Sequence, residues 1–367
     1  MDRKSWIISI FVFLSIGITG VLFSCNAAKD RPEEATEMSN EEIKTAEAPV
    51  VGNNPVSVTT QLTGSALDRV NATGLHYNAD PYMIKHQNKY YCYTTGWYGV
   101  SVLRSDDLVN FEHMGFALED PTQINYWAPS VIYYQGVFYM YYSSTPEGDG
   151  DAFSHRLKVA TADNPLGPFT FRKQLYDDWT IDAHVVEKDG GLHLFFASKG
   201  TGPNGNFGTM CFYQKLGDPL NVSGSRRLVV YPTIAQELFD GGPDYCLEGP
   251  FYFEYGEIGY LMYSGNRWED PSYFVGYATC DAKIPLEEAV FTKYPDAATY
   301  RPVIGSDEKF TGMGHNSVIE GSNGELFIVY HGYPRVTTDL PGSKKARRMC
   351  ISQIFINGKE ITAVPNK

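Results

Sequence analysis

The chain has 367 residues, a length that suffices for one large domain or two ordinary ones, and its formal net charge is −13. Its 43% hydrophobic and 20% charged residues exclude a disordered acidic chain and a coiled coil, because both carry far more charge. The acidic excess also argues against nucleic-acid binding, which depends on clustered Lys and Arg. A 14% aromatic share with 35 Gly and 21 Pro predicts an all-β fold of short strands joined by tight turns.

The N-terminus is predicted to be an export signal. Arg3 and Lys4 precede an almost wholly apolar run over residues 6–22, and the run ends in Leu-Phe-Ser-Cys25. This ending resembles the bacterial lipobox, in which the Cys is lipidated and becomes the mature N-terminus. We therefore predict a lipoprotein signal peptide over residues 1–24 and export, with Cys25 holding the protein to a membrane of the cell envelope. An uncleaved spanning helix is the alternative, since about 18 apolar residues can cross a bilayer.

A flexible tether is predicted to follow over residues 25–60. Its sequence is rich in Glu, Ala, Asn and Thr and has no apolar periodicity. The folded domain is then predicted over residues 61–367.

Within this domain, one pattern recurs five times. A short strand opens with polar or small residues, and a turn and an aromatic-rich second strand follow. Successive copies lie 47 to 67 residues apart, against about 40 to 50 for a four-stranded propeller blade without insertions. The pattern predicts a five-bladed β-propeller, with a β-sandwich or a two-domain β-rich protein as the alternative. The key positions of the five copies are Asp80, Trp127, Asp182, Glu248 and His315.

In a propeller, the innermost strands start at the same end of the central channel. Asp80, Asp182 and Glu248 are therefore expected to meet in one pocket. Cleavage of a glycosidic bond by inversion needs one protonated carboxyl as acid and one carboxylate as base, and a third acid can raise the pKa of the first. Three acids from three blades meet these needs.

These five segments resemble the blade signatures of glycoside hydrolase family 43, in order and in rough spacing, over about residues 70–367. The resemblance implies a five-bladed propeller that acts by inversion, mostly on α-L-arabinofuranosides and β-D-xylosides of plant polysaccharides. It implies Asp80 as general base, Asp182 as the residue that tunes and orients the acid, and Glu248 as general acid. Ala183 departs from the family, in which Pro often follows the second Asp; we expect this to change the turn and not the chemistry.

Each acid taken singly could be an ordinary turn residue, and only the ordered set favours catalysis. Other carboxylates compete for the same roles, but each lies off the repeat position. These are Asp177, Asp178, Asp240, Asp244 and Glu254.

Two interpretations of His315 stay open. Its imidazole could bind a metal on the channel axis, and in the resembled family a histidine at this position often lies beside a central calcium or water-filled site. It could equally be a hydrogen-bonded polar residue that fills the channel, since one histidine is no metal motif and calcium prefers oxygen ligands.

Substrate binding is expected to involve flat aromatic rings and one arginine. Trp127 is the best placed to stack on a sugar ring, and Trp97, Trp179 and Trp268 are further candidates. Arg347 and Arg348 lie in a segment similar to the closing segment of the family, where an arginine reaches back to the pocket; the sequence does not decide between them.

The sequence thus predicts a lipid-anchored, monomeric α-L-arabinofuranosidase that requires no organic cofactor. A β-xylosidase or an exo-galactanase of the same fold is the first alternative. A retaining hydrolase is a second, with carboxyls about 5 to 5.5 Å apart in place of roughly 6.5 to 9.5 Å. A glycan-binding lipoprotein without catalysis is the third.

Overall fold

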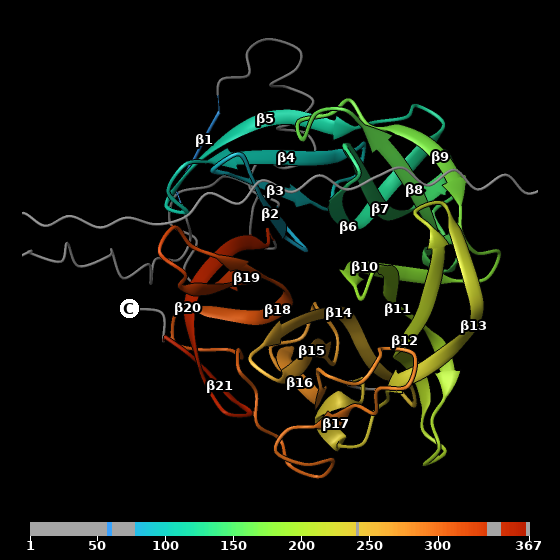
Figure 1. The fold of residues 1–367 in the computed structure, drawn as a ribbon, viewed down its shortest axis with the longest axis vertical. Helices are drawn as coiled ribbons and strands as arrows, with labels where there is room; N and C mark the ends of the chain where they lie inside the picture. Colours follow the sequence, from blue (N-terminus) through green and yellow to red (C-terminus); the bar gives the residue numbers. More distant parts are fainter. Residues whose placement is uncertain (1–56, 61–77, 240–241, 336–345, 365–367) are drawn as a thin grey trace, which may run out of the picture. The chain divides into compact units, whose positions relative to one another are not determined.

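A computed structural model describes residues 57–60, 78–239, 242–335 and 346–364. It is built almost wholly of β-strands, which form blades arranged in a ring (Figure 1). In this described part, no helix has the length and apolar character needed to cross a membrane. The predicted signal peptide, Cys25 and most of the predicted tether lie outside the described residues.

Each blade is an antiparallel sheet whose first strand is innermost (Figure 1). Blade one consists of β2 (Tyr82–His86), β3 (Lys89–Thr94), β4 (Val100–Ser105) and β5 (Asn110–Leu118). Blade two consists of β6 (Gln123–Tyr134), β7 (Val137–Pro146), β8 (Arg156–Ala162) and β9 (Thr170–Gln174), with the short 3-10 helix η1 (Ala152–Ser154) between β7 and β8. Blade three consists of β10 (Thr180–Lys188), β11 (Gly191–Thr201), β12 (Phe207–Asp218) and β13 (Asn221–Val230).

The last two blades repeat this order. Blade four consists of β14 (Tyr245–Tyr255), β15 (Ile258–Gly265), β16 (Phe274–Asp281) and β17 (Thr292–Lys293), and the 3-10 helix η2 (Ala235–Glu237) precedes it. Blade five consists of β18 (Phe310–Glu320), β19 (Leu326–Pro334), β20 (Arg348–Asn357) and β21 (Glu360–Ala363). Blades three and four join into one sheet because β12 and β14 also pair, in parallel. Gly208 allows this close approach, since a Cβ there would lie 2.0 Å from the Tyr245 carbonyl oxygen.

A strand before blade one differs from the sequence prediction. Residues Ser57–Thr60, predicted as the end of the tether, form β1 and pair in parallel with β5. An outer strand has unpaired backbone groups that a neighbouring extended segment can satisfy. These four residues therefore belong with blade one.

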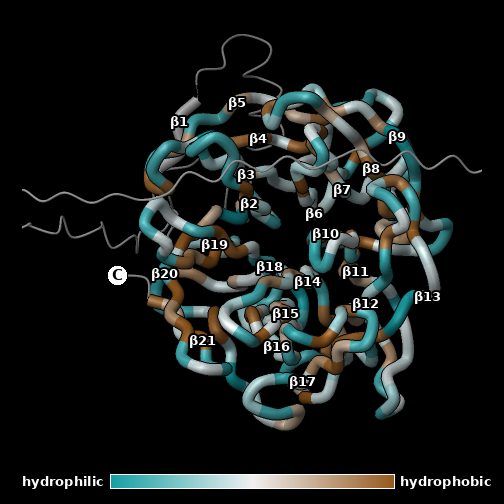
Figure 2. Tube along the Cα trace, in the orientation of Figure 1, coloured by the Kyte–Doolittle hydropathy of each residue, from teal (hydrophilic) through white to brown (hydrophobic). Residues whose placement is uncertain are grey.

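The hydrophobic core is divided into five clusters, one between each pair of neighbouring blades. Tyr93 of blade one packs in a cluster with Phe138 of blade two, and corresponding clusters follow around the ring. The fifth cluster joins Phe327 of blade five to Tyr90 of blade one, so the ring is closed. Apolar segments are accordingly found in all blades (Figure 2). The prediction of a five-bladed propeller is confirmed.

The inner strands share a backbone feature that the key positions from the sequence only approximate. Five equivalent residues near the start of the inner strands, one from each blade, share a left-handed φ between 43° and 60°. They are Asp80, Ala128, Asp182, Gly249 and His315. Trp127 and Glu248 thus lie one residue before the true repeat position. A left-handed conformation of a non-glycine residue costs about 1 to 3 kcal/mol and is concentrated at functional sites.

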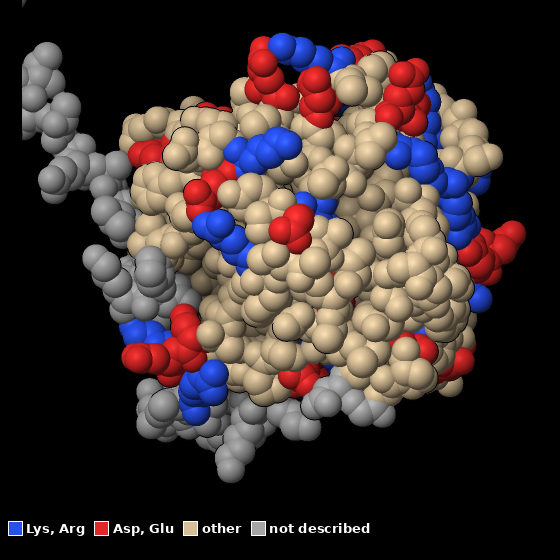
Figure 3. All heavy atoms as spheres, turned by 90° about the horizontal axis from the view of Figure 1, so that it is seen from below, with Lys and Arg blue, Asp and Glu red and all other residues tan. Residues whose placement is uncertain are grey.

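Charged side chains of both signs are interspersed on the face drawn in Figure 3. Oppositely charged side chains also pair, for example Lys215 with Glu287 and Arg301 with Glu360. This face therefore presents no broad surface of a single charge.

Candidate active site

A pocket of about 530 Å³ opens at the end of the channel where the inner strands begin. It brings together six of the seven predicted site residues, which come from all five blades. The lining residues are Asp80, Thr95, Gly96, Trp97, Asn125, Trp127, Ile181, Asp182, Glu248, Trp268, His315 and Arg347.

Arg348 is the predicted residue that is not among them. It is the first residue of β20, directly after Arg347. Consecutive side chains of an extended chain point to opposite sides, so only one of the two arginines can face the pocket. That residue is Arg347.

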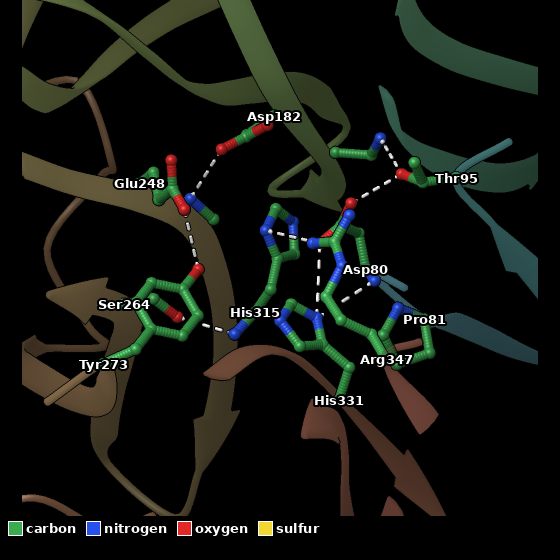
Figure 4. Close-up of polar contacts among 12 residues, drawn as sticks. Asp80, Pro81, Thr95, Asp182, Glu248, Ser264, Tyr273, His315, His331 and Arg347 are labelled. Atoms are coloured by element: carbon green, nitrogen blue, oxygen red, sulfur yellow. Dashed lines mark hydrogen bonds and ion pairs between the residues drawn. The ribbon is translucent and has the colours of Figure 1, made fainter. Parts of the chain in front are cut away.

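Asp80 is surrounded by donors and positive charge (Figure 4). Its Oδ1 accepts a hydrogen bond from Arg347 Nη1 at 2.9 Å, and its Oδ2 accepts one from the Thr95 hydroxyl at 2.5 Å. His315 Nδ1 and His331 Nδ1 lie 3.4 and 3.3 Å from Oδ1. Burial by itself raises the pKa of Asp80, but Arg347 and the two histidines outweigh it and hold this pKa well below its ordinary value. Asp80 is therefore a carboxylate at any ordinary pH.

Glu248 has a different environment. It accepts a hydrogen bond from the Tyr273 hydroxyl at 2.7 Å (Figure 4), and the Cys246 thiol lies 3.7 Å from its other oxygen. Burial raises the pKa of Glu248 to about 7, and the charge of Asp80 adds to this, while Tyr273 and Arg347 oppose it. Glu248 therefore keeps its proton up to neutral pH.

Asp182 of blade three is hydrogen-bonded to blade four next to Glu248. Its Oδ2 accepts a hydrogen bond from the Gly249 N–H at 2.9 Å, directly after Glu248 in the chain. Burial, followed by the charges of Glu248 and Asp80, raises the pKa of Asp182 well above its ordinary value. Ionisation of one of these two carboxyls therefore opposes ionisation of the other. The backbone of Asp182 has a left-handed φ, like the equivalent residues of the other blades. The replacement of the family's proline by Ala183 therefore does not change this conformation.

Three of the four candidate tryptophans line the pocket. Trp127 stacks on His155 with ring centroids 3.6 Å apart, and the Arg347 guanidinium lies 4.3 Å from the Trp268 ring centroid. Trp97 is 46% exposed. Trp179 lies outside the lining, where its Nε1 donates to the Ala152 carbonyl.

His315 lies between the pocket and the channel beneath it. The backbone N–H of His315 donates a hydrogen bond to the Ser264 hydroxyl at 2.7 Å. The channel cavity that it also borders holds only about 10 Å³, roughly the space of one water molecule. No group of three or more His, Cys, Asp or Glu residues in the described ranges could hold a metal ion. The predicted metal role of His315 stays a prediction.

The competing carboxylates lie elsewhere. Asp178 pairs with Arg226, Asp244 with Lys199 and Glu254 with Lys188. Together with Asp177, these residues are absent from the pocket lining, and Asp240 lies outside the described residues.

Sequence reasoning did not identify Thr95, Tyr273 and His331. Thr95 also accepts the Ala128 N–H at 2.8 Å and so links two blades, while the Asp80 N–H donates to His331 Nδ1 at 3.1 Å. Tyr273 fits because position 314 is glycine, where a Cβ would lie 2.1 Å from its ring. Among 26 tyrosines, no local pattern distinguishes this one.

Comparisons with known proteins agree with this arrangement. The family model described as "Glycosyl hydrolases family 43" matches residues 71–359. An extracellular exo-α-(1→5)-L-arabinofuranosidase of Streptomyces avermitilis is 26% identical over 302 residues, which cover 76% of this chain and 60% of that protein. A β-D-galactofuranosidase of Aspergillus niger is 25% identical, over 60% of this chain and 56% of that protein. The chain therefore spans less than two thirds of the length of these curated relatives.

A solved structure is similar over nearly its whole length. The crystal structure of a thermostable family-43 glycoside hydrolase is 30% identical with a TM-score of 0.67, and the match covers 84% of this chain and 95% of that one.

Proposed function

Because the chain belongs to glycosyl hydrolase family 43, we propose that it hydrolyses glycosidic bonds with inversion of configuration. The observation that carries this proposal is the contrast between two carboxyls of one pocket. Asp80 has its pKa held well below the ordinary value, whereas Glu248 has its pKa raised to about 7. Opposite shifts of this kind identify which group acts as base and which as acid.

In the proposed mechanism, Glu248 gives its proton to the leaving oxygen as the bond to the anomeric carbon breaks. Asp80 takes a proton from a water molecule, whose oxygen attacks that carbon from the opposite face. Asp182 accepts the hydrogen bond of the Gly249 N–H and so positions the acid, and the charge that Glu248 would gain on ionisation raises the pKa of Asp182. Exchange of both protons with solvent restores the starting state.

For the substrate, we propose α-L-arabinofuranosyl units of plant polysaccharides first. The relative from Streptomyces avermitilis, named as an exo-α-(1→5)-L-arabinofuranosidase, supports this proposal, as does a pocket sized for few sugar residues. A β-xylosyl unit is the second candidate, favoured by the relative from Xylanibacter ruminicola that is named a putative β-xylosidase.

The decisive experiment is hydrolysis of aryl α-L-arabinofuranoside and aryl β-D-xyloside by the full-length protein, with proton NMR of the first sugar anomer released. We expect one substrate to be cleaved and the first product to have the inverted configuration. A first product of retained configuration would replace inversion with a double displacement. Absence of hydrolysis of any arabinoside, xyloside or galactoside would favour the glycan-binding alternative.

We also propose that the protein is exported and held to a membrane through Cys25, as a monomer. The word "extracellular" in the name of the Streptomyces relative supports export, and the lipobox-like Leu-Phe-Ser-Cys25 supports the anchor. The closed ring of five clusters needs no partner to complete its core. A Cys25→Ala variant should move from the membrane fraction to the soluble fraction, and an unchanged distribution would contradict lipidation.

A further inference from the structure

A cluster of aromatic rings lies exposed beside the pocket. Phe153 and Phe207 are 58% and 47% exposed, whereas the rings of Phe138 and Phe195 are fully buried. Phe153 lies 6.2 Å from Trp179, measured between ring centroids. Lys199 Nζ stands between the two phenylalanines, 5.1 Å from the Phe153 ring centroid and 5.6 Å from that of Phe207. We call these four residues the rim platform.

The rim platform belongs to the same end of the propeller as the pocket. Phe153 lies in η1, Trp179 directly precedes β10, Lys199 is near the end of β11 and Phe207 begins β12. In the sheet, Thr180 is paired with Ser198 and Thr201 with Phe207, so Trp179, Lys199 and Phe207 lie at the end of blade three where Asp182 enters the pocket. Phe153 comes from blade two and joins them through its ring contact with Trp179.

A direct chain of contacts joins the rim platform to the pocket wall. Trp127, which lines the pocket, stacks on His155. The His155 Nδ1 and the Trp179 Nε1 both lie 3.0 Å from the Ala152 carbonyl oxygen. The platform therefore continues the aromatic surface of the pocket outward.

The η1 segment is held firmly in this position. The Phe153 N–H donates to the Asp151 carboxylate at 2.9 Å, and Arg156 donates to the Phe153 and His155 carbonyls at 2.8 Å each. An apolar ring kept exposed on a rigid support indicates a binding surface, because its ligand does not have to order it.

We propose that the rim platform binds additional sugar residues of a neutral glycan chain whose end occupies the pocket, an inference that rests on the proposed function. Flat rings offer stacking surfaces for the C–H faces of sugars. Lys199 is paired with Asp244 at 3.1 Å, so its charge is compensated and the surface suits an uncharged ligand. An ammonium group has three donors, which leaves Lys199 able to donate to sugar hydroxyls.

The test measures binding by titration calorimetry in the full chain carrying Glu248→Gln, which prevents turnover. The probes are α-1,5-linked arabino-oligosaccharides and β-1,4-linked xylo-oligosaccharides of two to six residues. We expect affinity for one series to rise with chain length. Adding Phe153→Ala and Phe207→Ala should weaken binding of its longest member by about tenfold or more, as for central aromatic contacts, and flatten the length dependence. Tyr at both positions should preserve it.

The matched control is Phe355→Ala. Phe355 is 54% exposed but lies eight residues after Arg347, roughly 26 Å along β20 at the usual rise per residue. The control should keep the length dependence, and thermal unfolding should show that every variant folds.

The proposal would be overturned if affinity did not rise with oligosaccharide length. It would also be overturned if the variant with both alanines showed the same rise as the chain that keeps both phenylalanines. Hydrolysis of the aryl glycosides by the unsubstituted chain is judged separately. If that hydrolysis is absent while the two rings still govern binding, the proposed activity fails and the glycan platform stands.

Discussion

The two sides of the pocket handle the same chemical group in opposite ways. On one side, blades one and five surround Asp80 with Arg347, His315 and His331, and the pKa of Asp80 falls well below its ordinary value. On the other side, blades three and four place Glu248 near Asp182, and desolvation raises the pKa of Glu248 to about 7. Desolvation raises the pKa of both carboxyls, so it does not by itself decide the protonation state. The nearby charges decide it.

The largest expected effect comes from removing the carboxylate of Asp80. Asp80→Asn should lower kcat by about 10²- to 10⁴-fold, the usual contribution of a general base. The loss should be similar for substrates with good and poor leaving groups, because activation of water is needed for both. Steady-state kinetics with a series of aryl glycosides of graded leaving-group pKa checks this. A loss that varied steeply with the leaving group would contradict the role of Asp80.

Glu248→Gln should reveal the other side of the comparison. Removal of the acid should lower kcat by about 10²- to 10⁴-fold on oligosaccharides, whose leaving group needs a proton, and much less on a nitrophenyl glycoside. The same kinetic series measures it. Equal losses on both kinds of substrate would show that Glu248 is not the proton donor.

The pH dependence of kcat/KM should shift in a defined direction when a group that lowers the pKa of Asp80 or Glu248 is removed. Arg347 lowers the pKa of Asp80, so Arg347→Met should raise this pKa and move the acid limb of the kcat/KM profile to higher pH. Tyr273→Phe removes a hydrogen bond that lowers the pKa of Glu248, so the alkaline limb, expected near 7, should move to higher pH. A Tyr255→Phe variant, at an exposed tyrosine outside the pocket lining, serves as the control and should shift neither limb. A shift of either limb in the opposite direction would contradict these environments.

The smallest effect concerns stability, and its sign differs between the two sides. Glu248 has a pKa of about 7 in the folded protein against an ordinary value of 4.5, so the native state binds more protons than the unfolded state and loses stability as pH rises from about 4.5 to 7. Glu248→Gln removes this loss and should raise Tm above pH 7, by about 2 to 4 °C for each kcal/mol regained.

Asp80→Asn should instead lower Tm at the same pH, because the buried charge of Arg347 loses its ion pair with Asp80. The depressed pKa of Asp80 stabilises the fold above the unfolded pKa and loses that effect as pH falls. Scanning calorimetry of both variants at pH 8 and at pH 5 measures the contrast. A lower Tm for both variants at pH 8 would contradict the opposite signs.

The sequence by itself determined the blade pattern and the acids. Strands rich in aromatics, turn residues and a spaced recurrence of polar openings are local features, and they predict five blades and the positions of Asp80, Asp182 and Glu248. The same features predict Trp127 and Glu248 as the repeat positions of blades two and four. In the structure, the residues with the left-handed φ are the next ones, Ala128 and Gly249. The local pattern does not distinguish these registers, because a backbone angle is set by the bulge that the whole blade requires.

The tertiary structure alone decided the roles within the pocket. Thr95 and Tyr273 reach Asp80 and Glu248 from 15 and 25 residues away, and Arg347 reaches Asp80 from 267 residues away. The structure also selected Arg347 over Arg348, since the two alternate along an extended chain. A pKa depends on burial and on charges a few ångströms away in space, and closure of the ring between blades five and one creates those neighbours.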